Sequence, residues 1–226
     1  MSLTFKIRHL SAVMLAMAAT LIMSAQERKL PAPSFAGGMP MNEVVASRHS
    51  IREFDRSREI SDSTLGQLLW MAVGVNRPDA APGRFGAPAN RSNPTARNWQ
   101  EIRAFVFDKN GVWEYRPASH SLELVKEGDH RNLIAGTKEF SQEFVLDAPA
   151  SILFVADMTE LPEGEQAKAM ALVDAGIACE NLNLACASER IATVPRATMD
   201  VASISALLGL TSRQFPVVNN PIGYAK

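Results

Sequence analysis

The chain has 226 residues, with 23 basic and 24 acidic side chains and a formal net charge of −1 at pH 7. Hydrophobic residues make up 46% and charged residues 21%, which are ordinary values for a globular protein. This length suits one domain with a full core. The near-neutral charge excludes the basic field of a nucleic-acid-binding protein, so no nucleic-acid partner is expected.

The first residues, 1–25, have the pattern of a secretory signal peptide. Lys6 and Arg8 form a basic start, an apolar run covers residues 10–23, and a Ser-Ala pair precedes a charged stretch. The run is shorter than the roughly 20 residues that span a bilayer, and the arrangement is typical of signal peptides. We expect an exported protein, periplasmic or secreted, without a stable membrane anchor after cleavage. The alternative is an uncleaved amphipathic arm.

The N-terminal half of the mature chain predicts an arm, two helices and a hairpin. Residues 26–40 are rich in proline and glycine and predict a linker or N-terminal arm, which leads into one domain over residues 41–226. Capping residues and helical spacing of apolar side chains predict helices over residues 42–47 and 64–74. Alternating residues around an Asn-Gly turn predict a β-hairpin over residues 102–115.

The C-terminal half predicts more strands and a long helix. Residues 150–156 are apolar on both faces, which indicates a buried strand. Residues 165–189 are rich in alanine and predict a long buried helix. Further elements are expected at residues 129–136 and 203–208 (helices) and at 191–194 and 215–218 (strands). Helices and strands are interleaved, so we expect an α+β fold with a mixed, mainly antiparallel sheet covered by helices.

Cys179 and Cys186 are the only cysteines, and both lie on the predicted long helix. Seven residues of helix separate their Cα atoms by about 10 Å, which is beyond disulfide reach. They are expected to be small core residues. No metal-ligand spacing is present among the cysteines and histidines, so no metal site is predicted.

Arg48, Ser50 and Arg52 stand at alternate positions beside His49. In an extended segment the three side chains point to one side. Two guanidinium groups and a hydroxyl then suit a phosphate, because each arginine offers a fork of N–H donors. The alternative interpretation is a surface strand that carries two arginines.

A proline-rich stretch over residues 75–98 has little apolar periodicity, and a loop of this length is usually functional. It ends in Thr95, Ala96, Arg97 and Asn98. The Asn98 amide has both a donor and an acceptor, which suits the polar edge of a planar ring. The alternative is an ordinary turn residue.

Four motifs in this order resemble the nitroreductase family of FMN-dependent oxidoreductases, including its SagB-type members. They are residues 48–52, residues 94–98, the small-residue helix around residues 174–185, and the closing Pro-Ile-Gly-Tyr at 221–224. The resemblance covers residues 41–224. It implies FMN as cofactor, with the first motif on the phosphate and ribityl chain and the second beside the flavin ring. The cofactor-binding residues expected on this basis are Arg48, His49, Ser50, Arg52, Thr95, Ala96, Arg97, Asn98 and Arg196.

The chain departs from the family pattern at two places. Many members continue past the Gly-Tyr motif to a second basic pair that binds the phosphate, whereas this sequence ends at Lys226. Arg97 and Arg196 are the alternatives for that role. Many members also have Gly-Leu-Gly after the long helix, where residues 190–192 here read Arg-Ile-Ala. A backbone that carries side chains is less free to approach a ligand.

The resemblance implies an oxidoreductase whose flavin hydride reduces a nitro-aromatic or quinone-like acceptor, with NAD(P)H as one candidate reductant. No catalytic side chain is assigned. Nicotinamide cofactors are not expected outside the cytoplasm, so an exported enzyme would need another reductant. Alternatives are an FMN-dependent dehydrogenase that oxidises a small organic or peptide substrate, and a flavin-binding or interaction module without turnover.

A homodimer is also expected. Members of the family are obligate homodimers with FMN at the interface. The predicted helix over residues 165–189 is apolar or small on most of its circumference, and such a helix must be covered on nearly all sides. A symmetric partner would supply the cover that one domain cannot.

Overall fold

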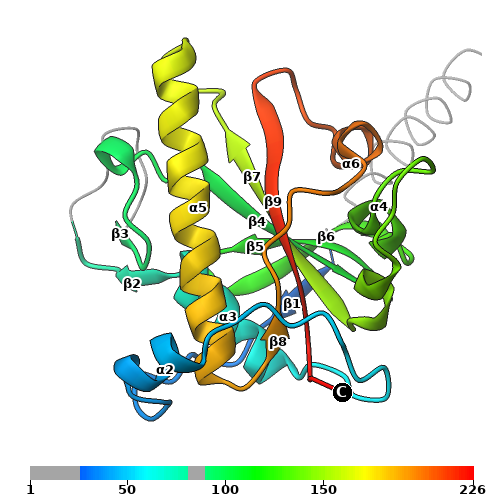
Figure 1. Cartoon of the computed structure of the whole chain (residues 1–226). Helices are drawn as coiled ribbons and strands as arrows, with labels where there is room; N and C mark the ends of the chain where they lie inside the picture. The colour runs from blue at the N-terminus through cyan, green and yellow to red at the C-terminus, as the bar shows by residue number, and fades with distance from the viewer. Residues whose placement is uncertain (1–25, 81–89) are drawn as a thin grey trace, which may run out of the picture.

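A computed structural model describes residues 26–80 and 90–226. Its strands form a seven-stranded antiparallel sheet in the order β1-β6-β5-β4-β7-β9-β8 and a separate pair, β2-β3. The strands are β1 (Glu27–Lys29), β2 (Val75–Arg77), β3 (Asn90–Arg91), β4 (Ile102–Asp108), β5 (Gly111–Arg116), β6 (Ser121–Glu127), β7 (Ala150–Asp157), β8 (Ala192–Thr193) and β9 (Gln214–Gly223). The expected α+β fold is confirmed (Figure 1).

Helices cover both faces of the large sheet. They are α2 (Met41–Ser47), α3 (Asp62–Val73), α4 (Arg131–Ala135), α5 (Glu165–Ser188) and α6 (Val201–Leu208), with 3-10 turns η1 (Ala96–Asn98) and η2 (Glu143–Asp147). In Figure 1, α5 runs across one face, while α4 and α6 lie together at the other side of the sheet. Apart from β9, the predicted helices and strands are confirmed to within two residues at each end.

Side-chain alternation along the central strands produces two cores. Ile102, Ala104 and Val106 of β4 belong to the core that includes α3 and α5, whereas Phe105 and Phe107 belong to the core that includes α4 and α6. Successive side chains of a strand point to opposite faces, so one apolar strand supplies both cores. This arrangement explains why the central strands are apolar throughout.

α5 packs tightly because its inner face is made of small residues. Ala171, Ala175 and Ala178 are fully buried, and α5 contacts α3 and strands of the sheet. Its outer face is different, since Leu172 and Val173 are exposed. By length and composition α5 is apolar enough to cross a membrane, but half of that stretch is buried within the fold. Such burial is typical of the core helix of a globular domain.

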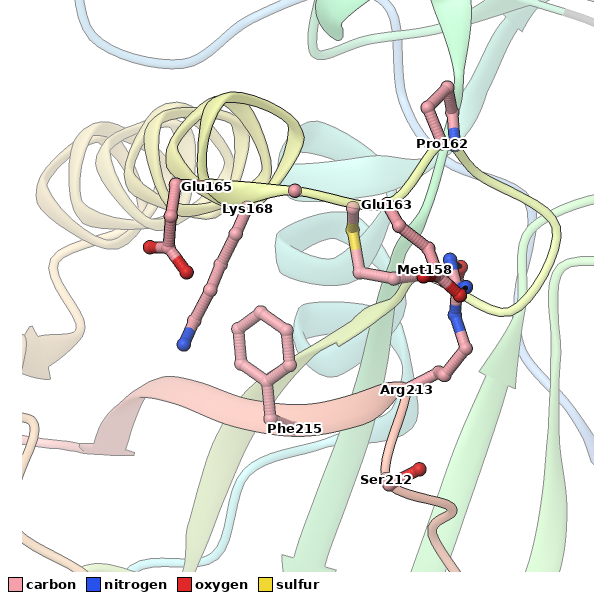
Figure 2. A pocket seen from close by; sticks show the side chains of 9 residues that line it. Met158, Pro162, Glu163, Glu165, Lys168, Ser212, Arg213 and Phe215 are labelled. Carbon is pink, nitrogen blue, oxygen red and sulfur yellow. Dashed lines mark hydrogen bonds and ion pairs between the residues drawn. The ribbon is translucent and has the colours of Figure 1, made fainter.

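Arg213 fixes the loop that leads from β7 into α5. Its guanidinium donates to the carbonyl oxygen of Met158 and to the carboxylate of Glu163, each at 2.5 Å. Figure 2 shows Arg213 at a hollow beside the start of α5, where the Lys168 ammonium lies 5.7 Å from the centroid of the Phe215 ring. Both cations are engaged by the protein and no predicted cofactor residue lines this hollow. We therefore give it a structural role.

Five strands differ from the sequence prediction. β2 and β3 lie in the stretch over residues 75–98 that was expected to be a loop. β6 is not predicted, because its charged residues obscure the alternation of Leu122 and Leu124. β1 lies within the arm expected over residues 26–40 and forms the outermost strand beside β6. β9 reaches Gly223, well beyond the predicted strand over residues 215–218.

Pro216 and Pro221 conceal the length of β9 in the sequence. Pro216 lies where the pairing with β7 shifts, since Phe154 pairs with Val218 and Val155 pairs with Pro216. A bulge of this kind tolerates a residue that has no N–H to donate. The continuing strand then carries the buried Asn219 and Asn220 into the centre of the fold.

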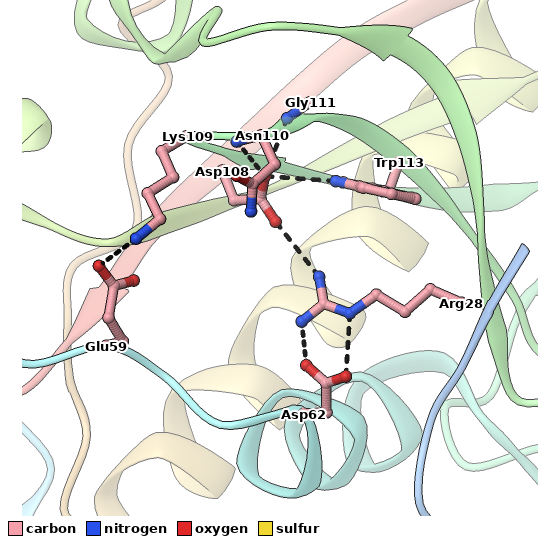
Figure 3. A network of polar contacts seen from close by, with 8 residues as sticks. All are labelled: Arg28, Glu59, Asp62, Asp108, Lys109, Asn110, Gly111 and Trp113. Carbon is pink, nitrogen blue, oxygen red and sulfur yellow. Dashed lines mark hydrogen bonds and ion pairs between the residues drawn. The ribbon is translucent and has the colours of Figure 1, made fainter. Parts of the chain in front are cut away.

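Arg28 joins β1 to two other parts of the molecule (Figure 3). Its guanidinium pairs with Asp62 at the start of α3 through a fork of two N–H groups, and it reaches Asp108 at 3.4 Å. The other Asp108 oxygen accepts from the N–H groups of Asn110 and Gly111 at 2.8 and 2.9 Å, which holds the hairpin turn. One arginine therefore links the arm, α3 and the β4–β5 turn.

We expect Arg28→Ala to lower the free energy of unfolding by about 1 kcal/mol, because a partly exposed pair in a network is worth somewhat more than an isolated surface pair. In a domain of this size that corresponds to roughly 2–4 °C in Tm. Urea titration measures the effect. Lys29→Ala is the matched control on the same strand, and equal losses in the two variants would contradict a role for the Arg28 network.

Candidate functional site

The segment after α2 is extended but is not part of the sheet. Arg48 ends α2 with extended dihedral angles, φ −61° and ψ 120°. The Ile51 N–H then donates to the carbonyl of Thr193 at 2.9 Å, and Phe54 forms an isolated bridge with Ala225. The predicted phosphate-binding residues are thus fixed between β8 and the C-terminal residues.

Arg48 lines a hollow of about 230 Å³ between the end of α5 and β8, together with His49, Asn183 and Arg190. Among the described residues its ion-pair partner is Glu180, at 4.0 Å from Nε to Oε1. A pair this long and half exposed holds the guanidinium weakly. Arg48 is therefore free to bind an anion.

Arg190 is a second cation of this hollow and lies outside the motifs that predicted the cofactor-binding residues. Its backbone is left-handed, with φ 56°, a conformation that favours glycine. This explains why many family members have Gly-Leu-Gly where residues 190–192 here read Arg-Ile-Ala. The signal in the sequence was a charged residue at a position where the pattern has glycine.

Arg52 lies apart from Arg48. It is exposed and lines a different hollow, together with Phe54, Phe144 and Lys226. Ser50 is exposed as well. Within one chain the two arginines of the motif therefore do not share a hollow, in contrast to the single row of three donors expected from strict alternation.

The second predicted motif is a tightly turned loop. Arg97, Asn98 and Gln100 all have left-handed backbones, with φ of 52°, 56° and 56°. Non-glycine residues in this region are strained, and such strain is concentrated at functional sites. Thr95 Oγ1 accepts from the Gln100 N–H at 3.0 Å, and the Ala96 N–H donates to Asp174 of α5 at 2.7 Å. The loop is thereby tied to the core helix.

The side chain of Asn98 is engaged within the loop. Its amide nitrogen donates to Asn90 at 2.8 Å, and its amide oxygen accepts from Gln100 at 3.0 Å. Arg97 is exposed, and Trp99 is buried in the larger core. In this conformation the loop presents backbone groups and Arg97 to solvent, and Asn98 maintains its shape.

A buried amide stands beside this loop without a hydrogen bond. Asn93 is 3% exposed, and among the described residues neither its amide oxygen nor its nitrogen has a partner. Buried polar groups are almost always paired, so an unpaired one indicates a place for water or a ligand atom. Sequence pattern alone gave no sign of Asn93.

Arg196 is not an available phosphate-binding group. It is 7% exposed, and its guanidinium donates to the carbonyl oxygens of Ile134 and Ala135 and to the side chains of Gln142 and Asn219, at 2.7 to 3.1 Å. Burial lowers the pKa of Arg196 to about 10. All of these partners are neutral acceptors. Because Ile134 and Ala135 belong to α4 and Asn219 belongs to β9, Arg196 joins these two elements. Of Arg97 and Arg196, the two further candidates for a phosphate contact, only Arg97 is exposed.

The donor set fits FMN in its chemistry. Arg48 and Arg190 supply cations beside an apolar wall, and the strained loop supplies polar backbone groups. The hollow contacts α5 through Asn183, and the loop contacts α5 through Asp174. Nine residues of helix separate these two positions by about 14 Å. The hollow of about 230 Å³ is smaller than the roughly 300–1,000 Å³ of complete ligand pockets. The hollow in this chain is therefore too small to be a complete cofactor site.

The chain matches the family model described as "Nitroreductase family" over residues 45–224. It therefore belongs to the nitroreductase family, as the motifs predicted. The family and fold identify a flavin-type oxidoreductase. A comparison with curated proteins gives no significant match.

Solved structures agree with this assignment. A protein from Ralstonia eutropha JMP134 assigned as a nitroreductase is 29% identical, covers 90% of this chain and 91% of its own length, and has a TM-score of 0.76. The Escherichia coli microcin synthetase complex McbBCD, with truncated pro-MccB17 bound, is 17% identical over 94% of this chain and 82% of that chain, with a TM-score of 0.63. A Clostridium acetobutylicum protein assigned as an NADH oxidase is 17% identical over 81% of this chain and 87% of that chain, with a TM-score of 0.55. The two more distant likenesses bear on the fold alone.

We expect Arg196→Met to lower the free energy of unfolding by about 3 kcal/mol, because it leaves several buried acceptors unpaired. Chemical denaturation of the purified protein measures this change. Arg97→Met, at an exposed position, is the matched control and is expected to change stability by less than about 0.5 kcal/mol. A stable Arg196→Met protein with weakened flavin binding would instead identify Arg196 as a ligand-binding residue.

Proposed function

We propose that this protein is a homodimeric oxidoreductase that binds FMN non-covalently and reduces nitro-aromatic or quinone-like acceptors. The observation that carries the proposal is the weakly paired Arg48 guanidinium, which lines a hollow at the end of α5 in a chain of the nitroreductase family. The family generally uses FMN with NAD(P)H. The substrate class rests on the family alone.

Each part of the site has a distinct role in this proposal. Arg48 and Arg190 bind the phosphate, and His49 and Ser50 follow Arg48 in the chain. Arg52 interacts with the polar end of the cofactor, where a positive charge favours the reduced ring. The loop at residues 95–98 borders the ring through Thr95, Ala96 and Asn98. When bound, FMN accepts a hydride and passes electrons to an oxidised acceptor.

The protein's own groups do the remaining work. The strained loop is held by Asp174, so its shape is set before a ligand arrives. The apolar wall of the hollow, with Ile51 and Ile191, excludes water from the ligand. No side chain in either motif is an evident general acid, so protons at the acceptor come from solvent.

The identity of the electron donor depends on location. NAD(P)H is the donor that the family suggests, and one structural relative is assigned as an NADH oxidase. We also propose that residues 1–25 direct export and are then removed; these residues lie outside the described part of the structure. In an exported protein a donor other than NAD(P)H would be required.

A second candidate function is the oxidation of a small organic or peptide substrate by FMN. The likeness to a chain of the microcin synthetase complex, which extends over 94% of this chain, favours it. Both functions use the same cofactor site. The two functions differ in the direction of electron flow. Turnover with an added peptide and oxygen would indicate substrate oxidation, whereas turnover with a quinone would indicate acceptor reduction.

Two features of α5 support the proposed dimer. Its outer face exposes Leu172 and Val173, the latter 62% exposed, although both are apolar. The Arg48 hollow at its end is too small for a complete cofactor site. A two-fold partner packed on this face would cover the apolar residues and enlarge the site.

We expect the purified protein to carry FMN, and we expect Arg48→Ala to weaken FMN binding by about 1.5–3 kcal/mol, the scale of a charge-assisted hydrogen bond. That is roughly tenfold or more in Kd. Flavin release by heating identifies the cofactor, and titration of the apoprotein gives the affinity.

Lys126→Ala, which removes an exposed cation on β6, is the control for net charge. It is expected to leave FMN affinity unchanged. A colourless protein that takes up no added FMN would refute the cofactor and the proposed function together. Equal FMN affinity in wild type and Arg48→Ala would show that another cation binds the phosphate.

We expect the protein to sediment as a dimer at low micromolar concentration, with a total buried area well over 2,000 Å², as in obligate dimers. Val173→Glu should produce monomers, because it places a charge on the outer face of α5. The control is Val201→Glu, which puts the same charge at an exposed valine of α6. Analytical ultracentrifugation distinguishes the species, and a wild-type monomer that retains FMN would exclude the shared site.

A further inference from the structure

Two buried carboxyl groups meet beneath the strained loop. Glu101 follows the loop and is 5% exposed, and Asp174 on α5 is 3% exposed. Glu101 has no role in the cofactor site proposed above, and Asp174 acts there only by holding the loop. Carboxylates are rarely buried this deeply unless they are paired or protonated.

The hydrogen bonds around the two groups are unequal. Asp174 accepts from the Ala96 N–H at 2.7 Å. Among the described residues, neither carboxyl oxygen of Glu101 accepts a hydrogen bond from another residue. The side chain that neighbours this carboxyl group is Asp174. Two ionised carboxylates offer only acceptors to each other. A hydrogen bond between them requires that one group carries a proton.

Burial and the neighbouring Asp174 carboxyl favour that protonated state. Burial, followed by the nearby Asp174, raises the pKa of Glu101 to about 7, against the opposing effects of its own backbone N–H and of Arg91. Arg91 is held by the Ile102 carbonyl at 2.6 Å and forms no ion pair with Glu101. On the open side, Arg103 and Asp157 line the same hollow as Glu101, and these two pair with each other at 3.4 Å.

We propose that Glu101 and Asp174 share one proton and that this carboxyl pair positions residues 95–98, so that the shape of the loop depends on protonation. The step from loop shape to cofactor binding rests on the proposed function. The two acids are positioning residues, because they act through the Ala96 backbone.

The direction of the effect follows from linkage. The pKa of Glu101 in the folded protein lies above its ordinary value of 4.5. The stabilisation from the shared proton is therefore fully present below about pH 4.5 and is lost as the pH rises through about 7. Above that point two negative charges repel each other beneath the loop, and the left-handed residues Arg97 and Asn98 lose the contact that maintains them.

The test is an NMR titration of the flavin-free full chain, labelled with ¹⁵N-alanine and with ¹³C at the glutamate side-chain carboxyl. We expect the Ala96 amide and the Glu101 carboxyl to titrate together with a midpoint near pH 7. In Glu101→Gln, a neutral donor replaces the shared proton, and the Ala96 amide should show no titration. Glu160→Gln, at an exposed acid of the same hollow, is the control and should behave as wild type.

Independent titrations would overturn the proposal, as would a Glu101 carboxyl that is fully ionised at pH 5. The wild-type measurement alone decides this if a variant fails to fold. A second measurement concerns FMN: the ratio of the wild-type Kd to the Glu101→Gln Kd should rise several-fold between pH 6 and pH 8, because titration of the FMN phosphate affects both proteins alike. Coupled NMR titrations without any FMN binding would uphold the proton-sharing pair and refute the proposed function, and a constant ratio would refute the link between them.

Discussion

The packing of α5 on the sheet is the constraint on which the rest of the structure depends. Alanine side chains on its inner face let it lie close to α3 and to the central strands. The same helix holds the loop at residues 95–98 through Asp174 and lines the Arg48 hollow through Asn183. Both parts of the candidate site therefore take their position from one rigid element, which is how precise sites are generally built.

Patterns among neighbouring residues predicted most of the fold. Features that depend on contacts between distant parts of the chain were not predicted. Helix spacing and the Asn-Gly turn gave correct boundaries because each depends on neighbouring residues. β6 was missed because its partner strands supply the burial of Leu122, and β9 was shortened because Pro216 sits in a bulge that only the pairing reveals. In the site, residue types identified Arg48 and the loop, but the burial of Arg196 and the exposure of Arg190 depend on contacts over long separations.

The site also shows how one backbone position can be filled in two ways. Where many family members have glycine, Arg190 adopts a left-handed conformation with φ 56°. The strain is modest for a single residue, and in exchange the hollow gains a cation beside Arg48. Arg190 is therefore the group best placed to add a second positive charge beside Arg48.

The strand order has a consequence for how the chain reaches its native state. Arg28 pairs with Leu122 and Ile152 pairs with Asn220, so neighbouring strands are joined across 94 and 68 positions. Folding that depends on such distant pairings is slow, on the order of milliseconds to seconds. Until β9 arrives, β7 exposes an unpaired edge in a segment that is apolar on both faces. The newly made chain is therefore most prone to aggregation at β7, and low temperature or a holding chaperone during synthesis should raise the soluble yield.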